Sequence, residues 1–275
     1  MAVKTVGMIG LGEMGRPMTR HLISGGFEVV AFDVNQNAVK TAVALGARAA
    51  ADPAALAARS DVVIVVVGFD SEVLKVVGAD DGVLKGVRPG TVIAVCSTVS
   101  PETMTALAGD PRAHGVRFVD APLCRGAEAA ERGKLLVMGG GEKDAFEACR
   151  PAFATFADAI FHLGPLGSGQ VGKMVNNLVL WACISINHEG LKLGKAFGLE
   201  EDILRQALLH SSASNWALET MAVNRPMPWA EKDMTIVLQE ADAKRLSLPL
   251  SGTVREVIKG IKIELGQAIP KVPKG

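Results

Sequence analysis

The chain has 275 residues, 49% of them hydrophobic, and its 29 Lys and Arg residues balance 29 Asp and Glu residues. A chain of this length buries a substantial core and usually forms one large or two moderate domains. Zero net charge without a dense basic run argues against nucleic acid as the main partner. No long apolar stretch is free of Gly, Lys or Asp, which argues against a transmembrane helix.

The reactive residue types narrow the chemistry further. The sequence contains no tyrosine, which excludes a reductase mechanism that relies on a catalytic Tyr. Its five histidines lack metal-ligand spacing, so we expect no metal site. The cysteines form no C-x-x-C pair, which is typical of a reduced, cytoplasmic protein; they are Cys96, Cys124, Cys149 and Cys183.

The first expected strand, Thr5–Ile9, leaves no room for a signal peptide and runs into a glycine-rich turn. Gly10, Gly12 and Gly15 have the G-x-G-x-x-G spacing of a dinucleotide fingerprint, and a helical segment follows them. Gly10 permits the tight turn, Gly12 lets a pyrophosphate approach the backbone, and Gly15 lets the helix pack on the strand. The start of that helix offers N–H groups to the phosphates. The alternative is a glycine turn without a ligand.

The second expected strand, Glu28–Phe32, ends at Asp33, where a ribose-binding acid belongs. The carboxylate accepts hydrogen bonds from the adenosine ribose of NAD but repels the 2′-phosphate of NADP. Neither Val34 nor Asn35 supplies an arginine for that phosphate. We therefore expect NAD to be preferred over NADP by roughly ten- to a hundredfold. The alternative is that Asp33 caps the N-terminus of the next helix.

Short β-branched runs and Ala-rich stretches alternate up to about residue 160, which predicts a parallel sheet with crossover helices. The remaining expected strands are 62–67, 91–96, 117–120, 135–139 and 159–162. The expected helices between the strands are 37–45, 53–58, 101–108 and 143–156. Asp52 and Ser100 precede the prolines that begin two of these helices, so we expect both to be N-caps.

The pattern changes after the glycine-rich segment 164–169, beyond which no β signal appears. Residues 170–197 predict one long helix that is apolar on nearly every face and is therefore buried between domains or subunits. Further helices are expected at 200–210, 215–223, 232–246 and 251–263. We predict a Rossmann-type α/β domain with a doubly wound parallel sheet over residues 1–163. An all-helical substrate and oligomerisation domain follows over residues 164–275.

Four segments of the sequence, taken in order, carry a family resemblance; they are residues 10–18, 120–122, 167–177 and 232–233. Together they resemble the β-hydroxyacid dehydrogenases, the group that contains 3-hydroxyisobutyrate dehydrogenase and tartronate semialdehyde reductase. The resemblance covers essentially the whole chain. Its most specific element is the Lys-x-x-x-Asn motif that follows the glycine-rich segment.

The resemblance implies that Lys173 is the catalytic lysine and Asn177 its partner. The two residues are four apart on the predicted long helix, so both side chains project from one face. Apolar surroundings desolvate an ammonium group in part and favour the neutral amine. Such an amine can exchange a proton with a carbonyl oxygen as hydride arrives or leaves. The alternative is a lysine whose ammonium group reaches the surface from a packed helix.

The resemblance also implies contacts with the dinucleotide. The glycine loop and the ends of two further strands hold most of them, at the edge where open α/β sheets bind ligands. Besides the three glycines and Asp33, the implied residues are Leu11, Glu13, Met14, Val67, Thr98 and Lys232. Lys232 resembles the lysine that reaches the nicotinamide side, and its alternative is a solvated residue at a helix start.

The substrate loop of the family commonly reads Asp-Ala-Pro-Val-Ser-Gly-Gly, whereas residues 120–126 read Asp-Ala-Pro-Leu-Cys-Arg-Gly. Cys124 stands in the place of the serine and Arg125 in that of a glycine, which weakens the case for 3-hydroxyisobutyrate itself. No histidine lies near Cys124 in the sequence, so we expect a contact residue and not a nucleophile.

Arg125 brings a guanidinium fork that suits a carboxylate, a sulfonate or a phosphate. We therefore expect a small anionic hydroxy acid or semialdehyde as substrate. Its contacts would come from Thr98, Cys124, Arg125, Gly126, Lys173 and Asn177. The alternative for Arg125 is a salt bridge with Glu128 or Glu131.

The predicted function is NAD-dependent hydride transfer with a short β-hydroxy acid or its semialdehyde, in a homodimer or homotetramer whose active site lies between the domains. One alternative is an imine reductase, although those enzymes generally carry another residue at the position of Lys173. A second alternative is a dinucleotide-binding protein without catalytic activity, which needs neither Lys173 nor Asn177.

Overall fold

The computed structural model describes residues 3–268. The chain divides into two compact units, Met1–Lys173 and Met174–Gly275, and each is described here by itself. The described strands all lie in the first unit and form one sheet. They are β1 (Thr5–Ile9), β2 (Glu28–Phe32), β3 (Arg48–Ala49), β4 (Val62–Val65), β5 (Val92–Val95), β6 (Arg117–Asp120), β7 (Leu123–Cys124), β8 (Leu135–Gly141) and β9 (Ala157–Gly164).

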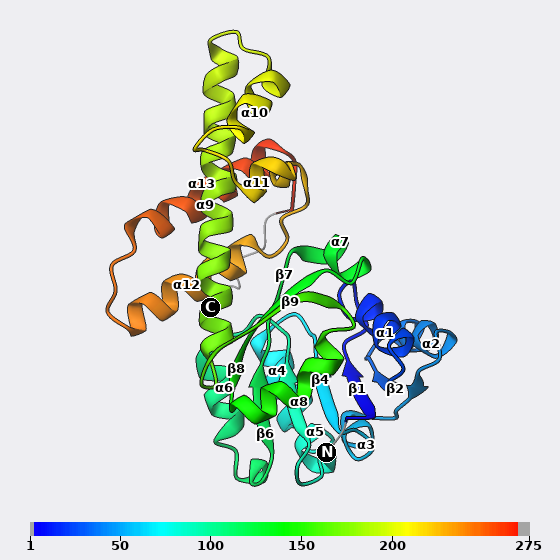
Figure 1. Ribbon diagram of the computed structural model, residues 1–275. Helices are drawn as coiled ribbons and strands as arrows, with labels where there is room; N and C mark the ends of the chain where they lie inside the picture. Colours follow the sequence, from blue (N-terminus) through cyan, green and yellow to red (C-terminus); the bar gives the residue numbers. More distant parts are fainter. Residues whose placement is uncertain (1–2, 269–275) are drawn as a thin grey trace. The chain divides into compact units, whose positions relative to one another are not determined.

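The first part of the sheet has the order β3-β2-β1-β4-β5-β6, and all of its pairs are parallel (Figure 1). This order reverses between β1 and β4, which is the point where doubly wound sheets bind dinucleotides beyond the carboxyl ends of their strands. The loop that follows β1 is therefore placed at the ligand-binding edge. The predicted Rossmann-type fold is confirmed.

Helices cover both faces of the sheet because the side chains of each strand alternate between two hydrophobic clusters. Val62 and Ile64 of β4 join one cluster, while Val63 and Val65 join the other. The helices on the first face are α1 (Gly15–Ser24), α2 (Gln36–Ala44) and α8 (Lys143–Phe153). Those on the second face are α3 (Pro53–Ala57), α4 (Asp70–Gly78), α5 (Val83–Gly86) and α6 (Pro101–Ala108).

The sheet departs from the prediction at its far side, where it is not parallel. Strand β8 runs antiparallel to β6 and to β7, and β9 then pairs parallel with β8. Between β6 and β8 lie the two-residue strand β7 and the short helix α7 (Gly126–Glu131), and α7 does not serve as a crossover between parallel strands. An antiparallel pair does not need a crossover connection, which is why the short segment between β6 and β8 suffices.

Local capping agrees with the sequence. The side chain of Asp52 accepts a hydrogen bond from the N–H of Ala55 at the start of α3, and Ser100 accepts one from Thr103 at the start of α6. Both predicted N-caps are confirmed. The short 3-10 helix η1 (Pro111–Ala113) completes the regular structure of the first unit.

The second unit is helical throughout its described part, residues 174–268, as predicted. Its long helix α9 (Ser168–Ala196) begins in the first unit, which ends at Lys173. The others are α10 (Glu201–Leu209), α11 (Trp216–Glu219), η2 (Ala222–Asn224), α12 (Ala230–Ala243) and α13 (Pro249–Glu264). Among residues 3–268, no helix combines the length and the apolar character that a membrane crossing requires.

Within the single chain α9 is covered on one side only, so burial of its other side by a second subunit stays a prediction. Trp181 and Ile184 pack with residues of α12 and α13, but one face of α9 stays exposed. The helices of the second unit therefore cover α9 from one side only. The large apolar residues that remain exposed on it are Val171, Val175, Val179, Ile186 and Leu193.

Candidate functional site

The glycine loop connects β1 to α1 and is held against the neighbouring strands. Gly10 has a φ of 89°, which the absence of a Cβ atom allows, and its N–H donates to the carbonyl of Phe32 at 3.1 Å. Leu11 is buried, whereas Gly12 and Glu13 are exposed and Met14 is half-buried. The loop thus presents its backbone outward at Gly12 and Glu13, next to the start of a helix.

The space around each glycine shows what the loop accommodates. A Cβ atom on Gly10 would lie 1.9 Å from the carbonyl oxygen of Val66, and one on Gly15 would lie 1.9 Å from that of Gly10. A Cβ on Gly12 would meet nothing within 4 Å. Two of the glycines are therefore required by packing within the protein, while Gly12 lines open space beside the helix start. This geometry fits a dinucleotide pyrophosphate.

Asp33 follows β2 and faces the same loop. Its Oδ2 accepts a hydrogen bond of 2.7 Å from the N–H of Leu11, and its Oδ1 accepts one of 2.7 Å from the N–H of Asn35. The N-cap of α2 is Asn35, so the alternative that Asp33 caps this helix is wrong. Each carboxylate oxygen keeps a further lone pair, which a ribose hydroxyl can use.

The ends of β4 and β5 are joined to each other. The N–H of Val67 donates to the hydroxyl of Ser97 at 2.8 Å, and Thr98, the next residue, is half-buried. The sequence predicts that Val67 and Thr98 follow neighbouring parallel strands. In the structure the two segments are in contact through the hydroxyl of Ser97. That serine was missed because a single hydroxyl after a strand has no periodic signal.

The substrate loop and the start of α9 meet within the first unit. The Nζ atom of Lys173 lies 3.7 Å from the Sγ atom of buried Cys124, at the end of β7. The amine comes from the second turn of α9, and the thiol comes from a strand 49 residues earlier in the sequence. Two residues that the sequence singled out separately are thus neighbours.

Arg125 has another partner than the sequence suggested. Its Nη1 donates to Asp158 of β9 at 2.5 Å and to the carbonyl of Lys134 at 3.0 Å. The alternative partners are wrong, because Glu128 pairs with Arg132, and Glu131 pairs with Arg16 and Arg20 of α1. Arg125 also has a φ of 81°, a left-handed backbone that favours glycine. Gly126 follows it with a φ of 75°.

Asp120 and Gln170 lie within the family motifs at 120–122 and 167–177, and both side chains are buried. The carboxylate of Asp120, at the end of β6, accepts hydrogen bonds from the N–H groups of Gly167 and Gln170, both at 2.7 Å. The amide of Gln170 bonds to the backbone of Ser97 and Val99. Both side chains are fully buried and therefore need polar partners, but this burial is decided by the tertiary structure and leaves no signal in the sequence.

Two predicted site residues lie in the second unit. Asn177, one turn beyond Lys173 along α9, is buried, and its Oδ1 accepts a hydrogen bond from Asn176. Lys232 of α12 has its Nζ 3.8 Å from Asp233 Oδ1 and 5.4 Å from the centre of the Trp229 ring. Lys232 is therefore not a solvated lysine at a helix start, because its side chain is only 19% exposed.

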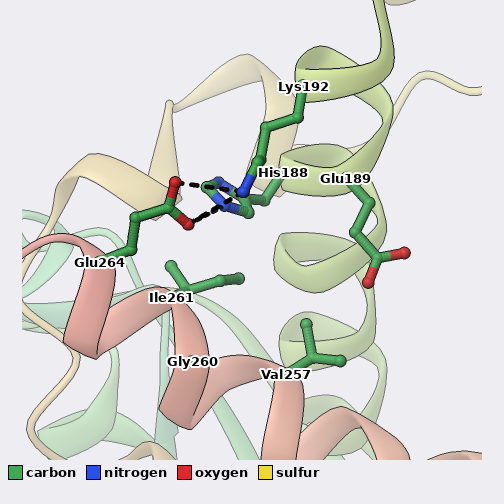
Figure 2. Close-up of a pocket in the computed structure, with 7 residues that line it drawn as sticks. All are labelled: His188, Glu189, Lys192, Val257, Gly260, Ile261 and Glu264. Atoms are coloured by element: carbon green, nitrogen blue, oxygen red, sulfur yellow. Dashed lines mark hydrogen bonds and ion pairs between the residues drawn. The ribbon is translucent and has the colours of Figure 1, made fainter.

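The second unit also contains a pocket of about 370 Å³ between α9 and α13 (Figure 2). The Glu264 carboxylate pairs there with Lys192 Nζ at 3.1 Å and with His188 Nε2 at 3.1 Å. Hydrogen bonds from Lys192 and then His188 lower the pKa of the Glu264 carboxyl. Because these polar side chains satisfy one another, the pocket resembles a polar link between two helices more than a binding site.

A second pocket of about 370 Å³ lies in the first unit, beside Phe118, Glu142 and Leu166, and it contains none of the predicted site residues. Within residues 3–268, no cluster of three His, Cys, Asp or Glu side chains is arranged to hold a metal ion. The candidate site is therefore the set of strand ends, the glycine loop and the start of α9.

Comparison with known proteins finds a matching dinucleotide-binding family in each half of the chain. Residues 5–164 match the family described as the NAD binding domain of 6-phosphogluconate dehydrogenase. Residues 167–268 match the family described as "NAD-binding of NADP-dependent 3-hydroxyisobutyrate dehydrogenase". The two descriptions name NAD and NADP, so they do not decide which of the two cofactors this chain prefers.

Individual relatives cover most of the chain. The NAD-dependent L-serine dehydrogenase of Pseudomonas aeruginosa is 38% identical over 82% of this chain and 75% of its own. The 3-hydroxyisobutyrate dehydrogenase of the same organism is 31% identical over 92% and 90%. The solved structure of 3-hydroxyisobutyrate dehydrogenase from Mycobacterium tuberculosis with L-serine superposes with a TM-score of 0.85. It is 26% identical and covers 95% of this chain and 94% of its own.

These matches cover both the α/β unit and the helical unit of the chain. The chain belongs to the 3-hydroxyisobutyrate dehydrogenase-like β-hydroxyacid dehydrogenases, a family of nicotinamide-dinucleotide-dependent oxidoreductases that act on hydroxy acids.

Proposed function

We propose that the protein transfers a hydride between NAD and a short β-hydroxy acid, or reduces the corresponding semialdehyde. Lys173 is the general acid and base in this proposal, and Asn177 is its partner. Relatives named as dehydrogenases of L-serine and of 3-hydroxyisobutyrate support the substrate class, since both compounds are short acids with a hydroxyl on the β carbon.

The observation that carries the proposal is the distance of 3.7 Å between Lys173 Nζ and Cys124 Sγ. It places a half-buried amine against the loop that the family resemblance assigns to the substrate. Partial shielding from water strengthens hydrogen bonds between such an amine and a substrate oxygen. A lysine that only reached the surface would not need to lie beside a buried thiol.

The nicotinamide, when bound, supplies or accepts the hydride. Lys173 donates a proton to the carbonyl oxygen of a semialdehyde as negative charge builds up there, and it takes a proton from the hydroxyl in the oxidative direction. Asn177, one helical turn further along α9, offers an amide that forms hydrogen bonds without adding charge. Neither step requires a tyrosine or a histidine.

Asp33 is the reason to propose NAD as the cofactor and not NADP. Its two oxygens accept hydrogen bonds from Leu11 and Asn35, which hold the carboxylate beside the glycine loop. A 2′-phosphate there would meet a like charge, while ribose hydroxyls would find acceptors. The relative with 38% identity is named as NAD-dependent, which agrees with this choice.

We propose Arg125 as a contact for the acidic group of the substrate, together with Thr98, Cys124 and Gly126. Both hydrogen bonds of its guanidinium within the described residues use Nη1, so Nη2 and Nε are placed to donate to an anion. The side chain is 40% exposed, and a small anion can reach it. The family glycine at this position could not make such a contact.

The exposed face of α9 supports a homodimer or homotetramer. Val175, Val179, Ile186 and Leu193 are exposed, and their spacing of four and seven residues places them along one side of the helix. Phe197, directly after the helix, is exposed as well. A continuous apolar stripe of this kind is typical of a surface that a second subunit covers. A monomer in size-exclusion chromatography with light scattering would contradict the oligomer.

We propose a cytoplasmic location because the thiols form no disulfide.

The test of the proposed function is the initial rate of NADH formation from NAD with a panel of hydroxy acids. The panel contains L-serine, 3-hydroxyisobutyrate, other short β-hydroxy acids and a β-hydroxy sulfonate. Lys173→Ala should lose at least about a hundredfold in kcat while its Kd for NAD stays within about twofold. Lys143→Ala, a change at an exposed lysine on α8, is the control and should keep the wild-type rate.

Three results would overturn the proposal. Lys173→Ala with the wild-type rate would remove the lysine from the reaction. Equal loss of NAD affinity and rate would make Lys173 structural. NAD binding without turnover of any hydroxy acid or semialdehyde, but with turnover of cyclic imines, would identify an imine reductase.

A further inference from the structure

Asp120 is a charged side chain with no exposed surface, and its partners are backbone groups. Oδ1 accepts from the N–H of Gly167 and Oδ2 accepts from the N–H of Gln170, each at 2.7 Å. These two N–H groups belong to the segment that enters α9 and to its first turn. The carboxylate therefore faces the positive end of a 29-residue helix, where a negative charge is stabilised.

Two opposing effects act on the pKa of the buried Asp120 carboxyl, and burial is the larger one. Burial raises the pKa of its carboxyl, while the N–H groups of Gly167 and Gln170 act in the other direction. A carboxyl without such donors would not be retained at a position that excludes water, because an unpaired buried charge is strongly destabilising. The contact between β6 and the start of α9 is thus tight and specific.

Gln170 forms the second half of the same arrangement. Its side chain is also fully buried, and it bridges to the segment after β5. The Nε2 group donates to the carbonyl of Ser97 at 2.8 Å, and Oε1 accepts from the N–H of Val99 at 3.1 Å. The amide therefore connects the first turn of α9 to the residues on both sides of Thr98.

The packing leaves the first turn of α9 no room to shift. A Cβ atom on Gly169 would lie 2.5 Å from the carbonyl oxygen of Met138 and 2.7 Å from Asp120 Oδ2. Only a glycine lets the helix approach the end of β6 and the middle of β8 this closely. Lys173 follows Gln170 by three residues, so its backbone is carried by the turn that these contacts hold.

We propose that Asp120 and Gln170 are positioning residues that hold Lys173 in register with the substrate loop and the end of β5. They form four hydrogen bonds between two strand ends and one helical turn, and none of them needs to touch the substrate. The inference rests on the proposed function of Lys173. Proton transfer demands hydrogen-bond geometry, and a misplacement of about 1 Å lowers a rate by about a hundredfold.

Asp120→Asn tests the proposal with a change of almost no volume. An asparagine has one oxygen and one NH2 group, so in either orientation a donor faces the N–H of Gly167 or Gln170 and one hydrogen bond is lost. We expect kcat on the best hydroxy acid of the panel to fall about 10- to 100-fold, with the Kd for NAD within about twofold of wild type. Gln170→Met, which removes both side-chain bonds at similar size, should have the same effect.

Asp52→Ala is the matched control, because it removes a carboxylate that caps a different helix of the same unit. Loss of an N-cap destabilises a protein by about 1 kcal/mol, and the free energy of unfolding of each variant is measured by urea titration. If Asp52→Ala lowers stability as much as Asp120→Asn but keeps kcat, the rate effect of Asp120 is not a general effect of stability.

A second readout does not depend on turnover. The rate of reductive methylation of the Lys173 amine by formaldehyde and cyanoborohydride, followed by mass spectrometry, should change several-fold in Asp120→Asn and Gln170→Met but not in Asp52→Ala. Wild-type kcat and an unchanged methylation rate in both variants would overturn the inference, even where Lys173→Ala is inactive. If Asp120→Asn does not fold, Gln170→Met alone decides. If Lys173→Ala is as active as wild type, the proposed function fails first and the inference with it.

Discussion

The carboxylate of Asp33 accepts a hydrogen bond of 2.7 Å from the backbone N–H of Leu11, in the middle of the glycine loop. The acid that would select the ribose therefore also holds the loop that would receive the pyrophosphate. Leu11 and Asp33 are 22 residues apart in the sequence, and the Asp33 side chain links the ribose position to the glycine loop. A substitution at Asp33 consequently affects both the choice of cofactor and the shape of the loop, and the variants have to separate the two effects.

Asp33→Asn and Asp33→Ala separate these effects. In the first variant the new amide oxygen can still accept from the N–H of Leu11, but the side chain no longer repels a 2′-phosphate. We expect the ratio of kcat/KM with NAD to kcat/KM with NADP to fall by at least about tenfold in Asp33→Asn. Asp33→Ala should lose affinity for both cofactors, because the loop loses its anchor. Unchanged selectivity in both variants would remove Asp33 from cofactor choice.

Gly12→Ala and Gly15→Ala distinguish a binding glycine from a packing glycine. The Cβ atom of the first variant meets nothing within 4 Å, whereas that of the second would lie 1.9 Å from the carbonyl oxygen of Gly10. Gly12→Ala should keep the free energy of unfolding within about 0.5 kcal/mol. It should still weaken NAD binding by at least about tenfold.

Gly15→Ala should instead be destabilised by more than about 1 kcal/mol, because the added methyl group overpacks the turn. Urea titration and calorimetric binding of NAD provide both numbers for each variant. Wild-type NAD affinity in Gly12→Ala would show that the open space beside this glycine does not receive the dinucleotide.

Arg125→Gly and Asp158→Asn test whether the guanidinium binds the substrate or only its ion-pair partner. Arg125→Gly loses an exposed ion pair, worth about 0.2–1 kcal/mol, but relieves a left-handed backbone at a φ of 81°. Its stability should therefore change little. If Arg125 binds the anion, KM for the acidic substrate rises at least about tenfold in Arg125→Gly, while Asp158→Asn does not raise it. Unchanged KM in both variants would leave Arg125 a structural residue.

The buried thiol of Cys149 predicts how stability depends on pH. Burial raises its pKa from 9.0 to about 12, with Arg117 acting in the opposite direction. The folded protein therefore keeps the proton while the unfolded chain releases it above pH 9.0. This contribution to stability is complete below pH 9.0 and is lost as the pH rises towards about 12, by at most about 1.4 kcal/mol per pH unit.

Urea titrations of the wild type and Cys149→Ala between about pH 7 and about pH 10.5 measure this effect. Because lysines also titrate in this range, the informative quantity is the difference in slope between the two proteins, not either slope alone. Above about pH 9 the free energy of unfolding should fall more steeply in the wild type than in Cys149→Ala. Parallel curves would show that the thiol ionises equally well in the folded protein.

Local chemistry made much of this fold predictable from the sequence. Strand Arg117–Asp120 and helix Pro101–Ala108 have the predicted bounds, since the strand formers Phe118 and Val119 mark the strand and a serine cap with a proline marks the helix start. Strand β7 was missed because two residues carry no periodicity. The short helix α5 is too brief for an apolar pattern to repeat.

The candidate site divides in the same way. The sequence by itself determined which residues stand after each strand and at the start of the long helix: the glycine loop, Asp33, Cys124 and Lys173. Only the tertiary structure decided what each touches: Leu11 for Asp33, Asp158 for Arg125, Cys124 for Lys173, and the start of α9 for Asp120. Spacing fixes direction within one strand or helix, but contacts between residues 22 to 49 positions apart depend on strand order and register, which arise from packing the whole sheet.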